Sequence, residues 1–315
     1  MALLEAEAKK LSNNDLVRGV IEEIIDVDQT FQLLPFVKTE GKAYVYNREN
    51  SLASAQFIKV SVDVPESATT FTEVSVTLRI IAGDVDVDNF MQATYSDTND
   101  QKSVQVAFKA KAMQRLWSDK FINGVSSTAY DLTALGGGGA ETNVEFDGMD
   151  TLATQVVFAN GATAGNGAAF NIDRLDVLID TVRTGMDAFV FSRRALRDYK
   201  KTLRALSAVT PEYITLANGS TALAYAGKPI LMNDFISDAK TVGTSTDCTT
   251  IYAAKMNEVD GLHGVFSGPS AGFQVIDIGQ LEKRDATRTR IKWYCALALK
   301  STKSLAKLTG VRPSA

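Results

Sequence analysis

The spacing of apolar residues near the N-terminus predicts an amphipathic helix. Leu16, Val20 and Ile24 recur on one face over residues 14–27, and an apolar stripe of this kind normally packs against another element. Pro35 follows, and because proline lacks an amide donor and favours an extended predecessor, extended structure is expected after the helix. The stripe is therefore a candidate docking surface for an adjacent copy of the chain.

Strict alternation of apolar and polar residues comes next, which is typical of half-exposed strands. Tyr44 and Tyr46 begin it, and segments 58–64 and 74–80 continue it on either side of Pro65. We predict that these two segments pair as a long two-stranded hairpin. Its second face is polar, and an isolated ribbon of this kind is marginal in water. The hairpin is thus a candidate arm that packs on a neighbouring subunit.

Helical spacing returns between Val104 and Ile122, where apolar residues form one stripe and most of the basic residues lie off it. This is the longest helix that the sequence predicts. Asn123 and Gly124 should end it, because both residues tolerate the left-handed conformation of a helix cap. Residues 124–169 are rich in glycine, so we expect a loop-rich stretch and a subdomain boundary there.

Helical and extended patterns alternate after residue 170, which indicates a compact α+β module. The predicted helices cover 172–184 and 195–206, and the predicted strands cover 188–191, 228–232, 250–253 and 288–308. The last strand runs apolar through Trp293 and Leu299, as expected of a strand that is buried on both faces.

Composition narrows the range of functions. The 315-residue chain has a net charge of −4, so it lacks the global basic field of a protein that holds a duplex through its phosphates. One histidine and two cysteines are too few for most histidine-centred catalysis, for a disulfide framework or for a zinc site. No apolar run is long enough to span a bilayer, and acids near the N-terminus argue against an export signal. We therefore expect a soluble protein that is not an enzyme and uses no cofactor or metal.

One motif suggests catalysis. Gly268–Gly272 spells G-x-S-x-G, the turn that exposes a nucleophilic serine in many hydrolases. No histidine follows Ser270, His263 precedes it, and Pro269 lies inside the motif. A surface turn is the preferred interpretation, and a serine hydrolase that uses Ser270 is a remote alternative.

Charge is distributed unevenly along the chain. Residues 21–100 hold fourteen acids against five bases, residues 282–315 hold nine bases against two acids, and residues 193–204 add a second basic stripe. A solvated helix face explains a single stripe, whereas the asymmetry between the ends favours head-to-tail packing of identical copies. We predict that acids of the hairpin meet bases of the long helix or of the second stripe in a neighbour; the candidates are Asp63, Glu66, Glu73, Lys109, Arg115, Arg194 and Arg197.

The order of these elements resembles the major capsid proteins of tailed bacteriophages with the HK97-like fold. The resemblance rests on Asn14–Ile25 with Leu33–Phe36, Pro65–Phe71, Gly83–Asp88 with the long helix that follows, Tyr225–Asp234, Gly261–Val265 and Arg290–Leu299. It covers nearly the whole chain, although no single segment is a signature. It implies an α+β fold with an N-terminal arm (1–37), an E-loop hairpin (38–83), a peripheral domain with a long spine helix (84–168), an axial domain (169–274) and return strands of the peripheral domain (275–315).

The resemblance implies a structural function. A major capsid protein would assemble in the host cytoplasm as hexamers and pentamers, form the icosahedral head of the virion, and enclose double-stranded DNA without sequence-specific binding. A portal protein is an expected partner. So is a separate scaffolding protein, because the chain begins almost directly with the arm, and a decoration protein is a further candidate. An encapsulin-like shell that encloses a cargo enzyme is the alternative within this fold.

The E-loop segment departs from one pattern found among such proteins, a covalent cross-link from a lysine near the E-loop tip. Val64 precedes Pro65 here, and the nearest lysine, Lys59, is offset along the strand. Covalent cross-linking between subunits is therefore not expected.

Overall fold

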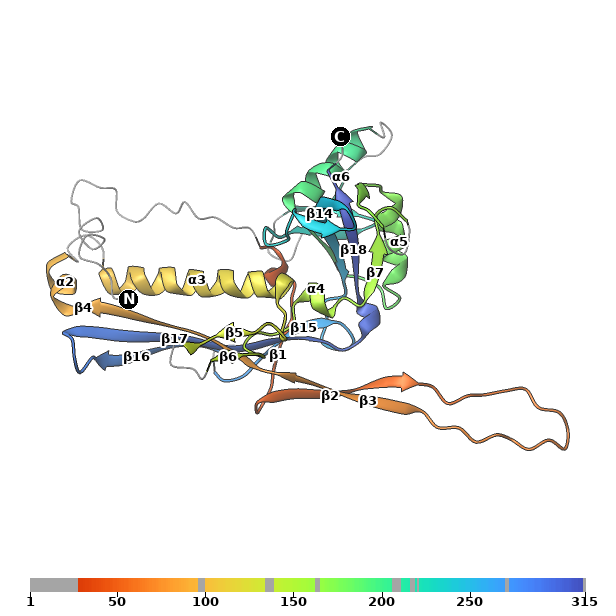
Figure 1. The fold of residues 1–315 in the computed structure, drawn as a ribbon, viewed down its shortest axis with the longest axis horizontal. Helices are drawn as coiled ribbons and strands as arrows, with labels where there is room; N and C mark the ends of the chain where they lie inside the picture. The colour runs from red at the N-terminus through yellow and green to blue at the C-terminus, as the bar shows by residue number, and fades with distance from the viewer. Residues whose placement is uncertain are drawn as a thin grey trace.

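The computed structural model describes residues 28–95, 100–133, 139–161, 165–205, 211–215, 219, 221–269 and 272–313. They form an elongated body of two parts, from which a hairpin projects (Figure 1). The predicted N-terminal helix with Leu16, Val20 and Ile24 lies outside the described residues, and so does Ser270.

The first part, which we call the peripheral sheet, lies beside the longest described helix, α3 (Figure 1). Its central strand pairs with one strand along one edge and with two along the other. The strands are β17 (Ala286–Leu299) at the centre, β4 (Arg79–Asp88) on one edge, β16 (Phe273–Gln280) and β15 (Leu262–Phe266) on the other, and β1 (Phe36–Lys38) beyond β15.

Helix α3 spans Gln101–Asn123 and confirms the predicted long helix. The Asp100 carboxylate caps it by accepting a hydrogen bond from a backbone amide of the first turn. Met113, Trp117 and Phe121 lie at helical intervals and are buried, because this stripe faces the peripheral sheet.

The C-terminus of α3 differs from the prediction. Gly124 has an extended backbone with φ −60° and ψ 138°, not the left-handed conformation that a glycine cap often adopts. Close approach of the chain explains the glycine instead, since a Cβ atom at Gly124 would lie 2.3 Å from the carbonyl oxygen of Phe146. The helix therefore ends where it was predicted to end, but for a different physical reason.

The second part, which we call the axial sheet, contains nine strands when counted over the described residues. In spatial order they are β10 (Glu212–Thr215), β11 (Thr221–Tyr225), β12 (Lys228–Met232), β9 (Ala188–Phe191), β14 (Ser245–Ala254), β18 (Leu305–Arg312) and β7 (Gln155–Phe158), with β13 (Lys240–Val242) on β14 and β8 (Ala168–Ala169) on β18. Helices α5 (Asp173–Thr181) and α6 (Arg193–Ala205) pack on one face of this sheet. The predicted α+β module is confirmed.

The apolar segment 288–308 is two strands and not the single strand predicted. Strand β17 ends at Leu299 in the peripheral sheet, and β18 begins at Leu305 in the axial sheet. Both strands are largely buried, so their apolar composition is similar and does not reveal the change of sheet. The polar turn between them carries the chain from one sheet to the other.

Shorter elements complete the two parts. They are η1 (Thr30–Gln32), α2 (Asn89–Tyr95), α4 (Met149–Leu152), η4 (Thr302–Ser304) and the strand pair β5 (Tyr130–Asp131) and β6 (Ala140–Glu141). The Asp88 carboxylate caps α2, because it accepts hydrogen bonds from the first backbone amides of that helix.

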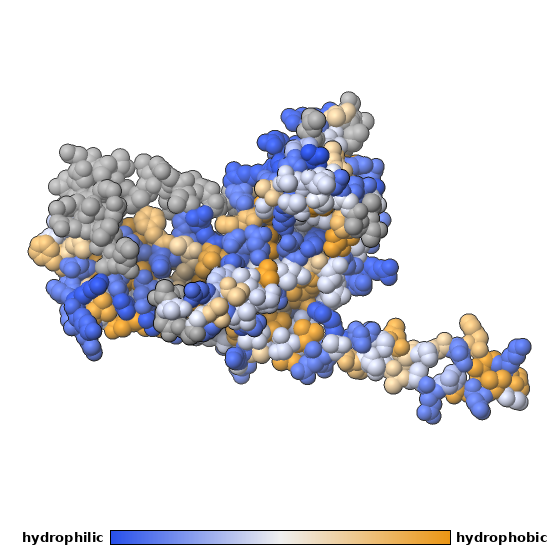
Figure 2. Space-filling model, in the orientation of Figure 1, coloured by the Kyte–Doolittle hydropathy of each residue, from blue (hydrophilic) through white to orange (hydrophobic). Residues whose placement is uncertain are grey.

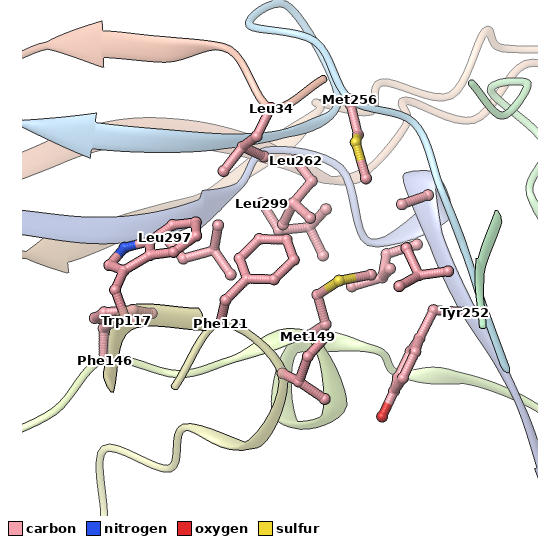
Figure 3. Close-up of a cluster of buried hydrophobic side chains, with 14 of the residues drawn as sticks. Leu34, Trp117, Phe121, Phe146, Met149, Tyr252, Met256, Leu262, Leu297 and Leu299 are labelled. Atoms are coloured by element: carbon pink, nitrogen blue, oxygen red, sulfur yellow. The ribbon is translucent and has the colours of Figure 1, made fainter. Parts of the chain in front are cut away.

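A buried apolar cluster joins α3 to both sheets (Figure 3). Trp117 and Phe121 of α3 share it with Leu297 and Leu299 of β17, and Met149 of α4 extends it toward the axial sheet. Burial of a large apolar side chain contributes roughly 1.5–3 kcal/mol. The cluster therefore stabilises the orientation of the two parts as well as each part.

A second apolar cluster lies between the axial sheet and helices α5 and α6. Strand β9 contributes to both clusters: Val190 belongs to the first and Phe189 to the second, and both are fully buried. The axial sheet thus has apolar cover on both faces at its centre, which explains the continuous apolar run of β9 in the sequence.

The hairpin forms with a different pairing from the one predicted. Strand β2 (Ala43–Ser51) pairs with β3 (Thr70–Thr77), so Tyr46 lies opposite Val74, and residues 52–69 form no ladder. The prediction paired 58–64 with 74–80 and was wrong, because alternation identifies a strand but not its partner. The pairing that forms lets the tyrosines of β2 contact the body, whereas the valines of 58–64 stay exposed, with no second layer among the described residues.

Candidate inter-subunit surfaces

The projecting end of the hairpin is the most conspicuous surface of the described chain. Residues 52–69 extend well beyond the body (Figure 1), and orange apolar residues gather at their far end (Figure 2). Phe57 and Val60 are fully exposed, and Leu52 and Val64 are 76% and 72% exposed. Large apolar side chains gathered in this way mark an interaction surface rather than ordinary solvated residues.

The three acids predicted to make inter-subunit contacts all lie on this hairpin. Asp63 and Glu66 belong to the unpaired segment 52–69, and Glu73 belongs to β3; all three are exposed. The structure therefore places them where a neighbouring chain could meet them. Their predicted ion pairs with a neighbour stay a prediction.

The root of the hairpin is tied to the body by hydrogen bonds that the sequence analysis missed. The Tyr46 hydroxyl donates to the Leu299 carbonyl oxygen at 2.7 Å. The Arg48 guanidinium donates to the same oxygen and to the Lys300 carbonyl oxygen, each at 2.6 Å. Leu299 is the last residue of β17 and Lys300 follows it, so the hairpin is anchored where the chain leaves the peripheral sheet.

The single histidine lies beneath this anchor. His263 is fully buried in β15, and its ring contacts the ring of Tyr44 edge-to-face at 5.6 Å. Its Nδ1 lies 3.3 Å from the Gly261 carbonyl oxygen, and its Nε2 has no hydrogen-bond partner among the described residues. Burial lowers the pKa of His263, and the charge of Lys300 lowers it further, which together outweigh the opposing effects of Gly261 and Glu258.

Acid is expected to destabilise the root of the hairpin through His263. A histidine with a lowered pKa binds fewer protons in the folded than in the unfolded state, so stability falls once the pH drops below the usual value of about 6.5. Thermal unfolding between about pH 6.5 and 5, above the range in which ordinary carboxyls titrate, should give a falling Tm for the native chain. His263→Phe keeps a ring against Tyr44 and should remove most of this slope. An equal slope in both proteins would contradict the prediction.

The charge asymmetry of the sequence is partly satisfied within one chain. Across the β4–β17 ladder Arg288 forms a bidentate pair with Asp86 at 2.6 and 2.7 Å, and Arg290 forms one with Asp84 at 2.7 and 2.8 Å. Hydrogen bonds from these arginines hold the pKa of both carboxyls below the usual range. The acid-rich and base-rich segments thus meet in the same sheet, and their asymmetry alone does not require head-to-tail packing.

The candidate bases of α3 are held against the body. The stem of Lys109 lies against Gly83 of β4, so closely that a Cβ atom there would fall 2.1 Å from the lysine Cε. Its charge also helps to lower the pKa of Asp84, after the larger effect of Arg290. Arg115 is partly buried on the same helix.

The candidate bases of α6 have different surroundings. The side chain of Arg194 is 13% exposed, and it donates to the Asp247 carbonyl oxygen at 2.7 Å while lying 3.6 Å from Asp238. Arg197 is exposed. Arg197 is therefore open to a partner, whereas Arg194 is largely occupied within its own chain.

One cluster of titratable groups lies outside these surfaces. Asp150 accepts from Tyr252 and forms ion pairs with Lys240 at 2.9 Å and Lys307 at 3.3 Å. Burial raises the pKa of Asp150, but the two lysines outweigh it and leave the pKa below the usual range. A carboxylate held ionised between two lysines is poorly suited to proton transfer at neutral pH. The cluster ties α4 to the axial sheet.

Other kinds of chemistry have little support in the described residues. They contain no group of three or more histidine, cysteine or acidic side chains placed to hold a metal ion. Cys248 and Cys295 are both buried, and burial raises the pKa of Cys295 to about 12, which disfavours a nucleophilic thiolate. None of the described helices has the length and apolar character needed to cross a membrane.

Comparison with known proteins finds similarity in structure and none in sequence. No family profile matches the chain, and no curated protein matches it by sequence. The holo-SrpI encapsulin complex from Synechococcus elongatus PCC 7942 matches with a TM-score of 0.72 at 18% identity, over 100% of this chain and 98% of that chain. The capsid of a native GTA particle matches with a TM-score of 0.63 at 12% identity, over 97% of both chains. A chain of Microbacterium phage Oxtober96 matches with a TM-score of 0.64 at 13% identity, over 99% of both chains.

The chain has the HK97-like fold. The matches span the full length of the chains, so the α+β architecture expected from the order of elements is confirmed.

Proposed function

We propose that this protein is a structural subunit whose identical copies assemble, as pentamers and hexamers, into a closed icosahedral shell. The observation that carries the proposal is the full-length likeness to shell-forming chains with the HK97-like fold. The protein is accordingly proposed to act by assembly and not as an enzyme, and no role is assigned to Ser270.

The exposed E-loop hairpin supports assembly independently of that likeness. Phe57 and Val60 are fully exposed in the unpaired segment of a ribbon that contributes little to its own core. Burying each of them on a neighbour would contribute roughly 1.5–3 kcal/mol. A hairpin of this kind extends the contact area between subunits toward the size that stable interfaces need. The N-terminal stripe of Leu16, Val20 and Ile24 is proposed as a second apolar contact.

Charge has a smaller role in this proposal. Exposed ion pairs contribute only about 0–1 kcal/mol each, and Lys109 and Arg194 already have partners or packing within the chain. Contacts from Asp63, Glu66 or Glu73 to a neighbour would therefore orient docking, whereas apolar burial would supply most of the affinity.

Two kinds of shell are candidates, and they differ in what they enclose. An encapsulin-like compartment that encloses a cargo protein is favoured by the higher TM-score to the encapsulin complex, 0.72 against 0.63 and 0.64. The second candidate is a bacteriophage head that encloses double-stranded DNA, with a portal protein, a separate scaffolding protein and a place in the virion. The likeness to the GTA and phage chains supports it, although they cover no more of this chain than the encapsulin chain does.

Purified particles distinguish these candidates. Expression of the chain should yield closed particles of uniform diameter by electron microscopy, and a product that stays monomeric at high concentration would overturn the shell proposal. Particles from the native source are then treated with nuclease and opened. Protected double-stranded DNA with a portal protein would establish the phage head, whereas a co-purifying enzyme without protected DNA would establish the cargo compartment.

A further inference from the structure

Helix α6 presents a uniformly basic face to solvent. Its exposed residues are Arg193, Arg197, Lys200, Lys201, Arg204 and the terminal Ala205. The opposite face packs on the axial sheet through Ala195, Tyr199 and Leu203. The chain as a whole has a net charge of −4, so this concentration of positive charge does not follow from composition.

The acids near α6 neutralise only the start of this face. Asp198, the one acid of the helix, is 3% exposed and lies on the buried side. Asp234 forms a bidentate pair with Arg193 at the first turn. No ion pair joins Arg197, Lys200 or Arg204 to an acid within the described part of the chain. Three cations therefore remain unneutralised along about 10 Å of helix, at a rise of 1.5 Å per residue.

We propose that this face of α6 binds the phosphate backbone of nucleic acid without sequence specificity. Positive charges at regular intervals along a helix suit a row of phosphates, and each neutralised phosphate releases condensed counterions. The only aromatic residue of α6, Tyr199, is buried, so the exposed face offers no platform for base stacking. DNA and RNA share the chemistry that this face would recognise. This inference goes beyond the proposed function, because shell assembly needs no nucleic-acid surface.

A neighbouring hairpin is a poorer occupant of this face. The hairpin end carries Phe57 and Val60 beside its acids and gains most from an apolar partner. The exposed face of α6 offers cations and no large apolar side chain. A polyanion matches it better than an amphipathic ribbon does.

The test compares two variants of equal charge. The α6 variant is the full-length chain with Arg197→Gln, Lys200→Gln and Arg204→Gln. The matched control carries three substitutions at exposed positions elsewhere, Lys42→Gln, Lys283→Gln and Arg284→Gln. Binding of a short labelled DNA duplex, and of a single-stranded RNA of equal length, is measured by fluorescence anisotropy over a range of salt concentrations, before and after assembly. Binding before assembly supports the proposal whether or not the assembled particle leaves the face accessible.

The expected result is a change of slope as well as of affinity. The α6 variant should bind duplex at least tenfold more weakly, and its plot of log affinity against log salt should be shallower by about 2 to 3, near 0.9 for each phosphate that the variant no longer neutralises. The control should match the native protein, and Arg197→Lys with Arg204→Lys should keep binding because the charge is retained. If the α6 variant loses more affinity for the RNA than for the duplex, RNA is the preferred ligand of this face; the reverse result identifies duplex DNA.

Two results would overturn the inference. In the first, the α6 variant and the control bind nucleic acid with equal affinity and equal salt dependence. In the second, the α6 variant fails to assemble while its nucleic-acid binding is unchanged, which would make the face a contact between copies. In the first case shells still form, so the failure of this inference is distinct from a failure of the proposed function. Circular dichroism establishes that each variant is folded.

Discussion

Replacing residues 53–68 with a short glycine-serine turn is expected to abolish shell formation and to leave the subunit folded. The segment forms no ladder and contributes no buried side chain to either core cluster. Loss of Phe57 and Val60 alone would remove about 3 kcal/mol or more from each contact, which lowers the association constant at least a hundredfold. Circular dichroism and thermal unfolding would report the fold, and particle counts by electron microscopy would report assembly.

A second variant separates the effect of apolar side chains from that of loop length. Phe57→Ser combined with Val60→Ser keeps the loop and should still reduce particle yield strongly. Gln56→Ser, at the exposed polar position next to Phe57, is the matched control and should assemble normally. Closed shells in normal yield from the truncated chain would show that the hairpin is not an assembly surface.

Local periodicity predicted the elements whose structure is decided by near neighbours. Helix α3 and helices α5 and α6 each bury one stripe, and a stripe at helical spacing can be read within a single segment. Strand pairing is different, because alternation says which residues share a face but not which strand lies opposite. Tyr46 therefore pairs with Val74, although Val60 has the same pattern and lies nearer to Val74 along the chain.

The candidate inter-subunit contacts show the same difference between features decided by near neighbours and features decided by distant segments. The acids of the hairpin were predicted on its polar face and are exposed, since alternation within a segment identifies which residues share that face. The ion pair between Asp86 and Arg288 was not predicted. The strands that carry these residues lie about 200 residues apart in the sequence and could as well have met between two chains. The anchors of the hairpin were also missed, since Tyr46 and Arg48 donate to backbone carbonyl oxygens, which every residue type carries.

Substituting the aromatic residue at the centre of the core should have the largest effect on the stability of the subunit. Trp117 has no exposed surface, and its ring centroid lies 5.1 Å from those of Phe31 and Phe121, 5.7 Å from that of Trp293 and 6.0 Å from that of Phe36. These rings come from α3, η1, β1 and β17, so one side chain holds α3 against the peripheral sheet.

Trp117→Ala should lower the free energy of unfolding by about 3–5 kcal/mol, because the cavity left behind is lined by rings that cannot collapse into it. Chemical denaturation of the unassembled chain measures the loss. Leu116→Ala is the control on the same helix, since that side chain is 46% exposed, and it should cost far less. Similar losses for the two variants would mean that Trp117 is not packed as described.

Trp117→Phe gives a sharper test of the same packing. The indole nitrogen of Trp117 is buried and has no hydrogen-bond partner among the described residues, and leaving a buried donor unpaired costs about 1–3 kcal/mol. Phenylalanine loses part of the ring volume but also removes the unpaired donor, so these two effects oppose each other. We expect Trp117→Phe to cost less than half as much as Trp117→Ala. An equal cost would show instead that the indole nitrogen stabilises the fold through a partner such as an ordered water molecule.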